Sequence, residues 1–220
     1  MYHSFFVAFL SLLNFEKLKN MKVIYPFIFF FGLFLWSCKS DSKNAHSSQA
    51  KQDDFNFSQF TIQKGQLGNI KLGMTIQEAE KQFSALDKKI DSANDFGLDG
   101  GSSIYLYYHK KEALFGLIPK LLTDTLYSII VLDPKFKTIE GLHKGSSVNE
   151  ILKVYPHSKA QLNWVNGNEN IVDTTNHLYF VFQTQKGKQV GDYSQSLQPS
   201  EPKNLSLQTD WIEIAPKRYW

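Results

Sequence analysis

The six histidines and the single cysteine are the side chains whose chemistry could support metal binding or nucleophilic catalysis. No two histidines stand in HxxxH or HExxH spacing, so the pattern that places two zinc ligands on one helix face is missing. A G-x-S-x-G nucleophile elbow, a P-loop and a dinucleotide-binding fingerprint are missing as well. The sequence therefore predicts a protein that is not an enzyme and has no catalytic residues, no metal site and no cofactor.

Acidic residues provide two further candidate sites. Residues 95–101, DFGLDGG, lack the D-x-[DN]-x-[DN]-G spacing and the terminal glutamate of a calcium loop, so we interpret them as a turn. Glu78 and Glu150 recur at matching places, but each follows a Thr or Ser by three residues at the start of a predicted helix. Helix capping accounts for both glutamates without any catalytic role.

Cys38 stands where an apolar segment changes to a polar one. Lys22 precedes an uncharged apolar run at 23–36, which is shorter than the roughly 20 residues that span a bilayer. A positive start and a short apolar run are typical of a secretory signal. The string LWSC at 35–38 resembles the lipobox of bacterial lipoproteins, although Trp36 stands where a small residue is usual. The resemblance implies a diacylglycerol on Cys38; the alternative is a plain N-terminal membrane anchor with an incidental cysteine.

The position of Cys38 also defines a predicted domain organisation. Ser, Lys, Asp, Asn and Gln dominate the segment after Cys38, and such a composition favours a flexible tether. Lys39 after the lipidated cysteine, by resemblance to the lipoprotein sorting rule, implies the outer membrane. We predict a wrongly assigned N-terminal extension at 1–20 with translation from Met21, a signal peptide at 21–37, a lipidated tether at 38–54, and a folded domain at 55–220.

Charge and composition exclude some classes of partner. The net charge is +3, part of it in the segment before Cys38, so the mature chain lacks the basic footprint of a nucleic-acid-binding protein. A single cysteine excludes an intramolecular disulfide. Aromatic residues make up 15% of the chain, which is enough to fill a substantial core.

An internal repeat is the strongest pattern in the predicted domain. Residues 70–83 align without gaps with residues 142–155, and each copy has a glycine, a hydroxyl residue two places later and a glutamate three places further on. The hydroxyl and the glutamate form a capping box, and the apolar spacing that follows predicts a helix with one buried face. Gly73 and Gly145 suit the tight turn before each helix.

Strand-like runs follow each predicted helix. Residues 104–108 align with 176–180 at an offset of 72, which is also the offset between the two helix starts. Separately, the run 125–132 has a counterpart at 210–215. The Gly, Gln, Ser and Pro-rich segment 184–204 is interpreted as a long mobile loop before the last strand. We predict an α+β fold in which two repeats, about 60–134 and 135–216, form an antiparallel sheet with helices packed on one face.

The duplicated Gly-x-[Ser/Thr]-x-x-Glu helix start resembles the β-lactamase-inhibitor-protein-like proteins and the SmpA/OmlA-type envelope lipoproteins. Those proteins pack short helices on an antiparallel sheet, and the resemblance implies that this chain binds another protein. The chain lacks the disulfides of some members and carries the 184–204 insertion, so no member's binding residues are transferred.

Aromatic residues on the predicted strands are the candidates for a binding surface. We predict a face made by Tyr105, Tyr107, Tyr179 and Trp211, because Tyr and Trp concentrate binding energy when they are desolvated. The alternative is that the tyrosines form a half-exposed surface with their hydroxyls in water. The predicted function is a lipid-anchored envelope protein that binds a protein partner; an inhibitor or immunity protein, and an envelope hydrolase, remain open.

Overall fold

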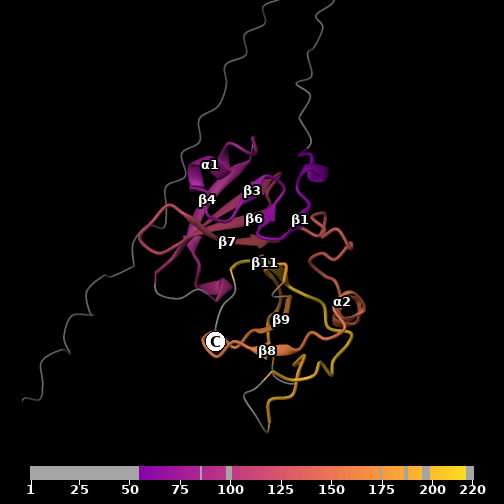
Figure 1. Cartoon of the computed structure of the whole chain (residues 1–220). Helices are drawn as coiled ribbons and strands as arrows, with labels where there is room; N and C mark the ends of the chain where they lie inside the picture. Colours follow the sequence, from indigo (N-terminus) through magenta and orange to yellow (C-terminus); the bar gives the residue numbers. More distant parts are fainter. Residues whose placement is uncertain are drawn as a thin grey trace, which may run out of the picture. The chain divides into compact units, whose positions relative to one another are not determined.

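The structure is a computed structural model that describes residues 55–84, 86–97, 101–173, 175–185, 188–194 and 199–216. All of these residues belong to one compact unit, Lys51–Trp220. An eight-stranded antiparallel sheet and a small three-stranded sheet dominate it (Figure 1). Among the described residues, no helix is long and apolar enough to cross a membrane.

The large sheet consists of two groups of four strands, and each group is consecutive in the sequence. In order across the sheet, the first group is β4 (Asp87–Ser92), β5 (Ser103–His109), β6 (Glu112–Pro119) and β7 (Leu126–Val131), and the second is β11 (Trp211–Ile214), β10 (Leu178–Phe182), β9 (Glu169–Asp173) and β8 (Ala160–Leu162). The small sheet holds β1 (Ile62–Gln63), β2 (Gln66–Leu67) and β3 (Ile70–Lys71), and the helices are α1 (Ile76–Glu80), α2 (Val148–Val154) and the 3-10 helices η1 (Phe57–Gln59) and η2 (Asn94–Phe96).

The predicted α+β class is wrong, because the described chain is mostly β with only two short α-helices. α1 has five residues and α2 has seven. α1 ends at Glu80, with Lys81 as its C-cap, so Phe83 lies beyond the helix; its ring still packs 4.7 Å from that of Tyr107. α2 stops before Pro156, since a proline disfavours helical geometry in the residue that precedes it.

The prediction also missed half of the large sheet. All six residues of β4 are exposed, so the strand shows none of the apolar alternation that identifies a strand. β6 has the opposite pattern, with six consecutive buried residues, because both faces of this inner strand are covered. Alternation of apolar and polar residues identifies strands that have one buried and one solvent-exposed face. β4 and β6 do not have that pattern.

The turn and helix start of the predicted repeat are confirmed. Gly73 and Gly145 have φ values of +88° and +90°, which only glycine adopts readily. The Gly73 N–H donates to the Leu126 carbonyl and the Gly145 N–H donates to the Thr209 carbonyl, both at 2.8 Å. Each helix start is therefore fastened in the same way to the beginning of the last strand of its own repeat.

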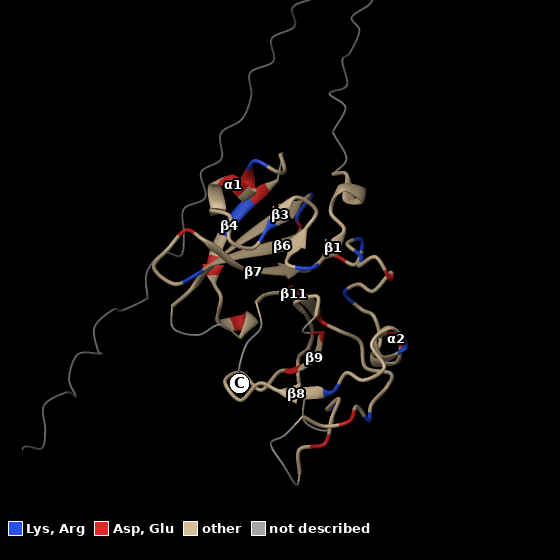
Figure 2. Ribbon diagram, in the orientation of Figure 1, with Lys and Arg blue, Asp and Glu red and all other residues tan. Residues whose placement is uncertain are grey.

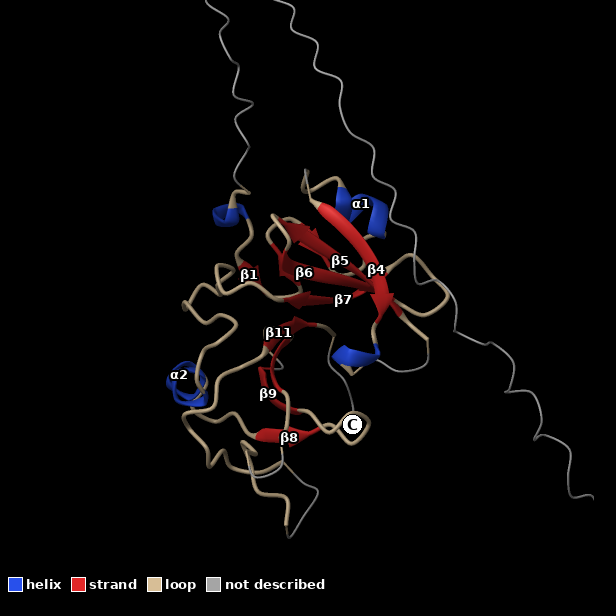
Figure 3. Cartoon of the chain, turned by 180° about the vertical axis from the view of Figure 1, so that it is seen from behind, coloured by secondary structure: helices blue, strands red, loops and turns tan. Residues whose placement is uncertain are grey.

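β7 and β11, the last strands of the two repeats, pair with each other at the centre of the sheet. Ile130 pairs with Glu213, flanked by the pairs of Ile129 with Ile214 and of Val131 with Ile212. Because β7 and β11 are equivalent in the two repeats and run antiparallel, the two groups of four strands are related by an approximate two-fold axis at this pair. Figures 1 and 3 show one group on each side of it.

The predicted match of 104–108 with 176–180 is wrong. Residues 104–108 lie in β5, the second strand after α1, whereas 178–180 lie in β10, the third strand after α2. Pairing order makes β5 equivalent to β9 and β6 equivalent to β10. A constant offset fails here because the connection 93–102 is longer than its equivalent at 163–168.

Apolar side chains cover both faces of the large sheet. On the first face, α1, α2 and the small sheet pack on a core that contains Ile76, Ile151, Phe115 and Phe180. The second face carries a smaller apolar cluster, in which the rings of Phe96 and Trp211 meet edge to face at 5.4 Å.

Candidate functional site

Two of the predicted binding tyrosines lie on the first face of the sheet. Tyr107 is 2% exposed, and its hydroxyl donates to the Glu80 carboxylate at 2.7 Å. Burial raises the pKa of Tyr107, and the hydrogen bond to Glu80 and the charge of that carboxylate raise it further. Tyr105 is partly buried beneath Lys88, whose Nζ lies 5.3 Å from the ring centroid. Tyr107 is thus part of the core under α1.

The other two predicted residues lie on the opposite face. Tyr179 and Trp211 are 2% and 4% exposed, and the Tyr179 hydroxyl donates to the Pro216 carbonyl at 3.0 Å. The structure therefore does not bring the four aromatic residues together on one surface. Strand alternation indicates which residues share a face, but it cannot show that another layer covers that face.

Glu78 and Glu150 have the capping role that the sequence predicts. The Thr75 N–H donates to the Glu78 carboxylate at 2.9 Å, and the Ser147 N–H donates to that of Glu150 at 2.7 Å. These backbone hydrogen bonds, followed by those from the Thr75 and Ser147 hydroxyls, lower the pKa of both glutamates. Within the described ranges, no three His, Cys, Asp or Glu residues could hold a metal ion together. Cys38 lies outside those ranges.

A candidate interaction site is the turn between β8 and β9, residues 163–168, which we name the 163–168 turn. At its tip Trp164 is 56% exposed and Val165 is 59% exposed. Asn163 and Asn168, on either side, are buried. Asparagine is usually exposed and tryptophan usually buried, so a turn that buries two asparagines and exposes a tryptophan is unusual.

Hydrogen bonds fix the backbone of this turn at several points. The Asn163 side chain accepts from the Val165 N–H at 2.9 Å, and the Asn163 carbonyl accepts from the Gly167 N–H at 2.8 Å. The Asn166 side chain accepts from the Asn168 N–H at 3.0 Å. Side-chain bonds of this kind replace backbone partners in tight turns, and here they hold the Trp164 backbone in one conformation.

The connection between β4 and β5 supports the turn from one side. Gly97 has a φ of +80°, and a Cβ added to it would lie 1.9 Å from Asn166 Nδ2. Only a glycine allows the Asn166 side chain to approach this closely. The 163–168 turn is therefore packed against a segment of the first repeat.

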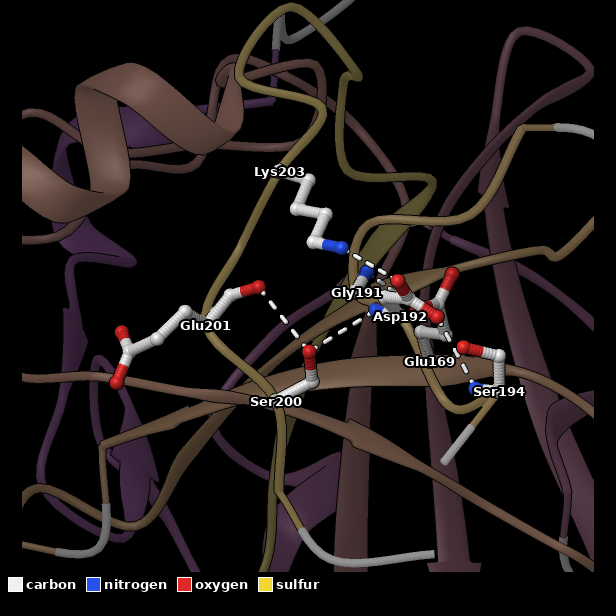
Figure 4. Close-up of polar contacts among 7 residues, drawn as sticks. All are labelled: Glu169, Gly191, Asp192, Ser194, Ser200, Glu201 and Lys203. Atoms are coloured by element: carbon white, nitrogen blue, oxygen red, sulfur yellow. Dashed lines mark hydrogen bonds and ion pairs between the residues drawn. The ribbon is translucent and has the colours of Figure 1, made fainter. Parts of the chain in front are cut away.

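A network of polar contacts holds the two strands that carry the turn (Figure 4). Glu169, the first residue of β9, is fully buried, and its carboxylate accepts from the N–H groups of Val190 at 2.7 Å and Gly191 at 2.9 Å. On β8, Ala160 and Ser200 exchange two backbone hydrogen bonds of 2.8 Å. The segment between β10 and β11 is thereby fastened to both strands.

Asp192 organises the rest of this network. Its carboxylate accepts from Lys203 and from the Ser194 N–H, while its own N–H donates to the Ser200 hydroxyl at 2.9 Å (Figure 4). The hydrogen bond from Lys203 is the main cause that lowers the pKa of Asp192. The predicted loop at 184–204 does precede the last strand, but its described residues are held by hydrogen bonds to the sheet and to each other.

None of the sites predicted from the sequence includes the 163–168 turn. Its signal is the string NWVNGN, in which three asparagines and a glycine predict a tight turn around a tryptophan. The exposure of Trp164 is not visible in that string.

Comparisons with known proteins do not assign a family. No protein-family model matches the chain, and no curated protein matches it. The structure is similar to the crystal structure of the uncharacterized protein YfeY from Escherichia coli, with a TM-score of 0.45 and 13% sequence identity, covering 71% of this chain and 97% of that chain.

Proposed function

We propose that this protein is a non-enzymatic envelope lipoprotein, anchored through Cys38 at the outer membrane, whose β domain binds another protein through the 163–168 turn. The exposure of Trp164 and Val165 on a hydrogen-bonded turn carries the proposal. A tryptophan is among the side chains that contribute most to a protein interface. Because the turn is already ordered, binding requires little loss of backbone freedom there.

The fastening of the hairpin supports this role. Glu169 holds β9, and Ser200 holds β8, so the strands on both sides of the turn are constrained. Charged residues of both signs are interspersed over the described elements, and the turn itself carries none (Figure 2). An apolar tip of this kind fits an apolar pocket on a partner protein. We also propose that the chain is related to the β-lactamase-inhibitor-protein-like and SmpA/OmlA-type proteins. The two capping boxes at equivalent places support this relationship.

The test is site-specific photocrosslinking in cells, with a photoreactive amino acid at position 164 or at position 122. Leu122 is the matched control because it is 96% exposed on a different turn. We expect one discrete crosslinked protein from position 164 and none of the same mass from position 122. The Trp164→Ala variant should lose that partner in co-purification, whereas Leu122→Ala should retain it. Equal co-purification with both variants would contradict the proposal.

The anchor is tested separately with a radiolabelled lipid precursor. We expect label in the wild-type chain and none in Cys38→Ala. Equal label in the two chains would remove the lipid from the proposal and leave the 163–168 turn untouched.

A further inference from the structure

A second feature outside the 163–168 turn is a cavity of about 570 Å³ at the end of the large sheet where β7 begins and β11 ends. Leu72, Leu126 and Pro216 supply apolar walls. A Cβ added to Gly73 would meet no atom within 4 Å, so the glycine leaves open space at one side. The volume lies in the range of sites that bind small molecules.

Two basic side chains, those of Lys64 and His177, line this cavity. Lys64 comes from the turn between β1 and β2, and His177 comes from the turn before β10. Neither side chain has a hydrogen bond or an ion pair within the described part of the chain. No Asp or Glu of that part lines the cavity. An ammonium group and an imidazole N–H that line a cavity without a carboxylate can both donate hydrogen bonds to an anion.

The backbone holds His177 in place at this position. Its φ of +60° is uncommon for a residue other than glycine, and its carbonyl accepts from the Ala215 N–H at 3.1 Å. A Cβ added to Gly65, the neighbour of Lys64, would lie 3.9 Å from His177 Nδ1. The turn that carries Lys64 and the imidazole of His177 therefore meet at the cavity, although they come from different sheets.

We propose that this cavity binds a small anion, a carboxylate or a phosphate, that is attached to an apolar group. Lys64 and His177 bind the anionic end, and Leu72, Leu126 and Pro216 contact the apolar part. Apolar walls with a few convergent polar groups are the common composition of such sites. A soluble metabolite and a lipid headgroup share this chemistry. The site is separate from the 163–168 turn, so its test does not depend on the proposed protein partner.

The experiment is calorimetric titration of the whole chain in nanodiscs of zwitterionic lipid, with the heat of empty nanodiscs subtracted. Phenyl phosphate combines an apolar ring with an anion, inorganic phosphate lacks the ring and phenol lacks the charge. We expect saturable binding of phenyl phosphate, and binding at least tenfold weaker for each of the other two probes. Nanodiscs with phosphatidylglycerol distinguish the sources: weaker binding of phenyl phosphate there identifies a lipid headgroup, and unchanged binding identifies a soluble ligand.

Matched variants show whether the binding occurs in this cavity. Lys64→Gln removes the charge at similar length, and His177→Asn retains a residue that tolerates left-handed geometry. The double variant should bind phenyl phosphate at least tenfold more weakly, with an unchanged urea unfolding curve. Lys71→Gln, an exposed lysine on β3 that does not line the cavity, should bind like the wild type. Absence of saturable binding to the wild type, or equal affinity in the double variant, would overturn the proposal.

Discussion

The two repeats begin alike and differ in what precedes their last strands. In the first, the short turn 120–125 joins β6 to β7; in the second, the long segment 183–210 joins β10 to β11. Ser200 of that segment pairs with the outer edge of β8, whereas no described residue pairs with the outer edge of β4. β4 instead exposes Lys88, Lys89 and Asp91, and charges of this kind discourage pairing with other chains.

The two repeats share one fold, but one ends in a strand edge that pairs with another segment, at β8, and the other ends in an exposed charged edge, at β4. The inserted segment pairs with one edge of the sheet through Ser200 and also fastens the hairpin that exposes Trp164. The first repeat has no such segment. Its connection between β4 and β5, which is equivalent to the 163–168 turn, contributes Gly97 to support that turn. A duplicated fold has thus been used asymmetrically, with one apolar tip and one charged edge.

The largest expected effect on stability comes from Glu169, the first residue of β9. Ser103 is the equivalent residue of the first repeat, at the start of β5. Glu169→Ala leaves the N–H groups of Val190 and Gly191 without their acceptor in a buried place. We expect a loss of about 3 kcal/mol in the free energy of unfolding. Urea unfolding followed by tryptophan fluorescence measures it.

The matched control is Ser103→Ala, an exposed position, which should change the free energy of unfolding by less than about 0.5 kcal/mol. Similar losses in the two variants would show that the network of Figure 4 does not stabilise the second repeat.

Gly73 and Gly145 should respond equally, because their backbone conformations match and neither has an atom within 4 Å of an added Cβ. Each alanine variant is expected to lose about 1–2 kcal/mol of unfolding free energy from left-handed strain alone. A loss in one repeat that is twice the loss in the other would break the equivalence of the two turns. Thermal and urea unfolding of the two single variants are the measurements.

The capping boxes should also be equivalent, with a smaller effect. Thr75→Ala and Ser147→Ala each remove the oxygen that accepts from the N–H of the third helical residue, at 3.1 and 3.2 Å. We expect a loss of about 1 kcal/mol in each variant. Serine at position 75 and threonine at position 147 are the conservative controls and should retain nearly all of the wild-type stability in urea.

The smallest expected effect is a dependence of stability on pH. The pKa of Glu78 and that of Glu150 are lowered in the folded chain by hydrogen bonds from the N-cap residues, so the unfolded chain binds protons first as pH falls. The contribution to stability is therefore complete above the ordinary glutamate pKa of about 4.3 and is lost as pH falls through the lower folded values. In Glu78→Gln and in Glu150→Gln, the free energy of unfolding should depend less on pH than in the wild type. Urea unfolding between pH 2 and pH 7 measures this dependence. A dependence as steep as that of the wild type would contradict the prediction.

Local features of the fold could be predicted because they depend on neighbouring residues. The hydroxyl and the glutamate of each capping box lie within one helical turn, and the left-handed glycines lie two residues before each cap. Strand β4 could not be predicted, since its hydrogen bonds to β5 come from residues elsewhere in the chain and its own side chains are all exposed. The equivalence of β5 with β9 was hidden by connections of different length.

The 163–168 turn also has one feature that the sequence predicts and one that it does not. Its asparagines and its glycine predict a turn, but the choice between exposing and burying an aromatic residue depends on what packs above it. Tyr107, Tyr179 and Trp211 are covered, whereas Trp164 is exposed at the tip of a hairpin.

The sequence by itself determined the helix starts, because each capping box joins residues within one helical turn. It also determined the left-handed turns, which depend on glycine itself, and the duplication, which is visible as two matching strings of residues. Only the tertiary structure decided the class of the fold, the central pairing of β7 with β11 and the surface on which an aromatic residue is exposed. Those features depend on contacts between residues far apart in the chain, such as Glu169 with Gly191 and Ser128 with Glu213. Side-chain spacing along one segment contains no information about such partners.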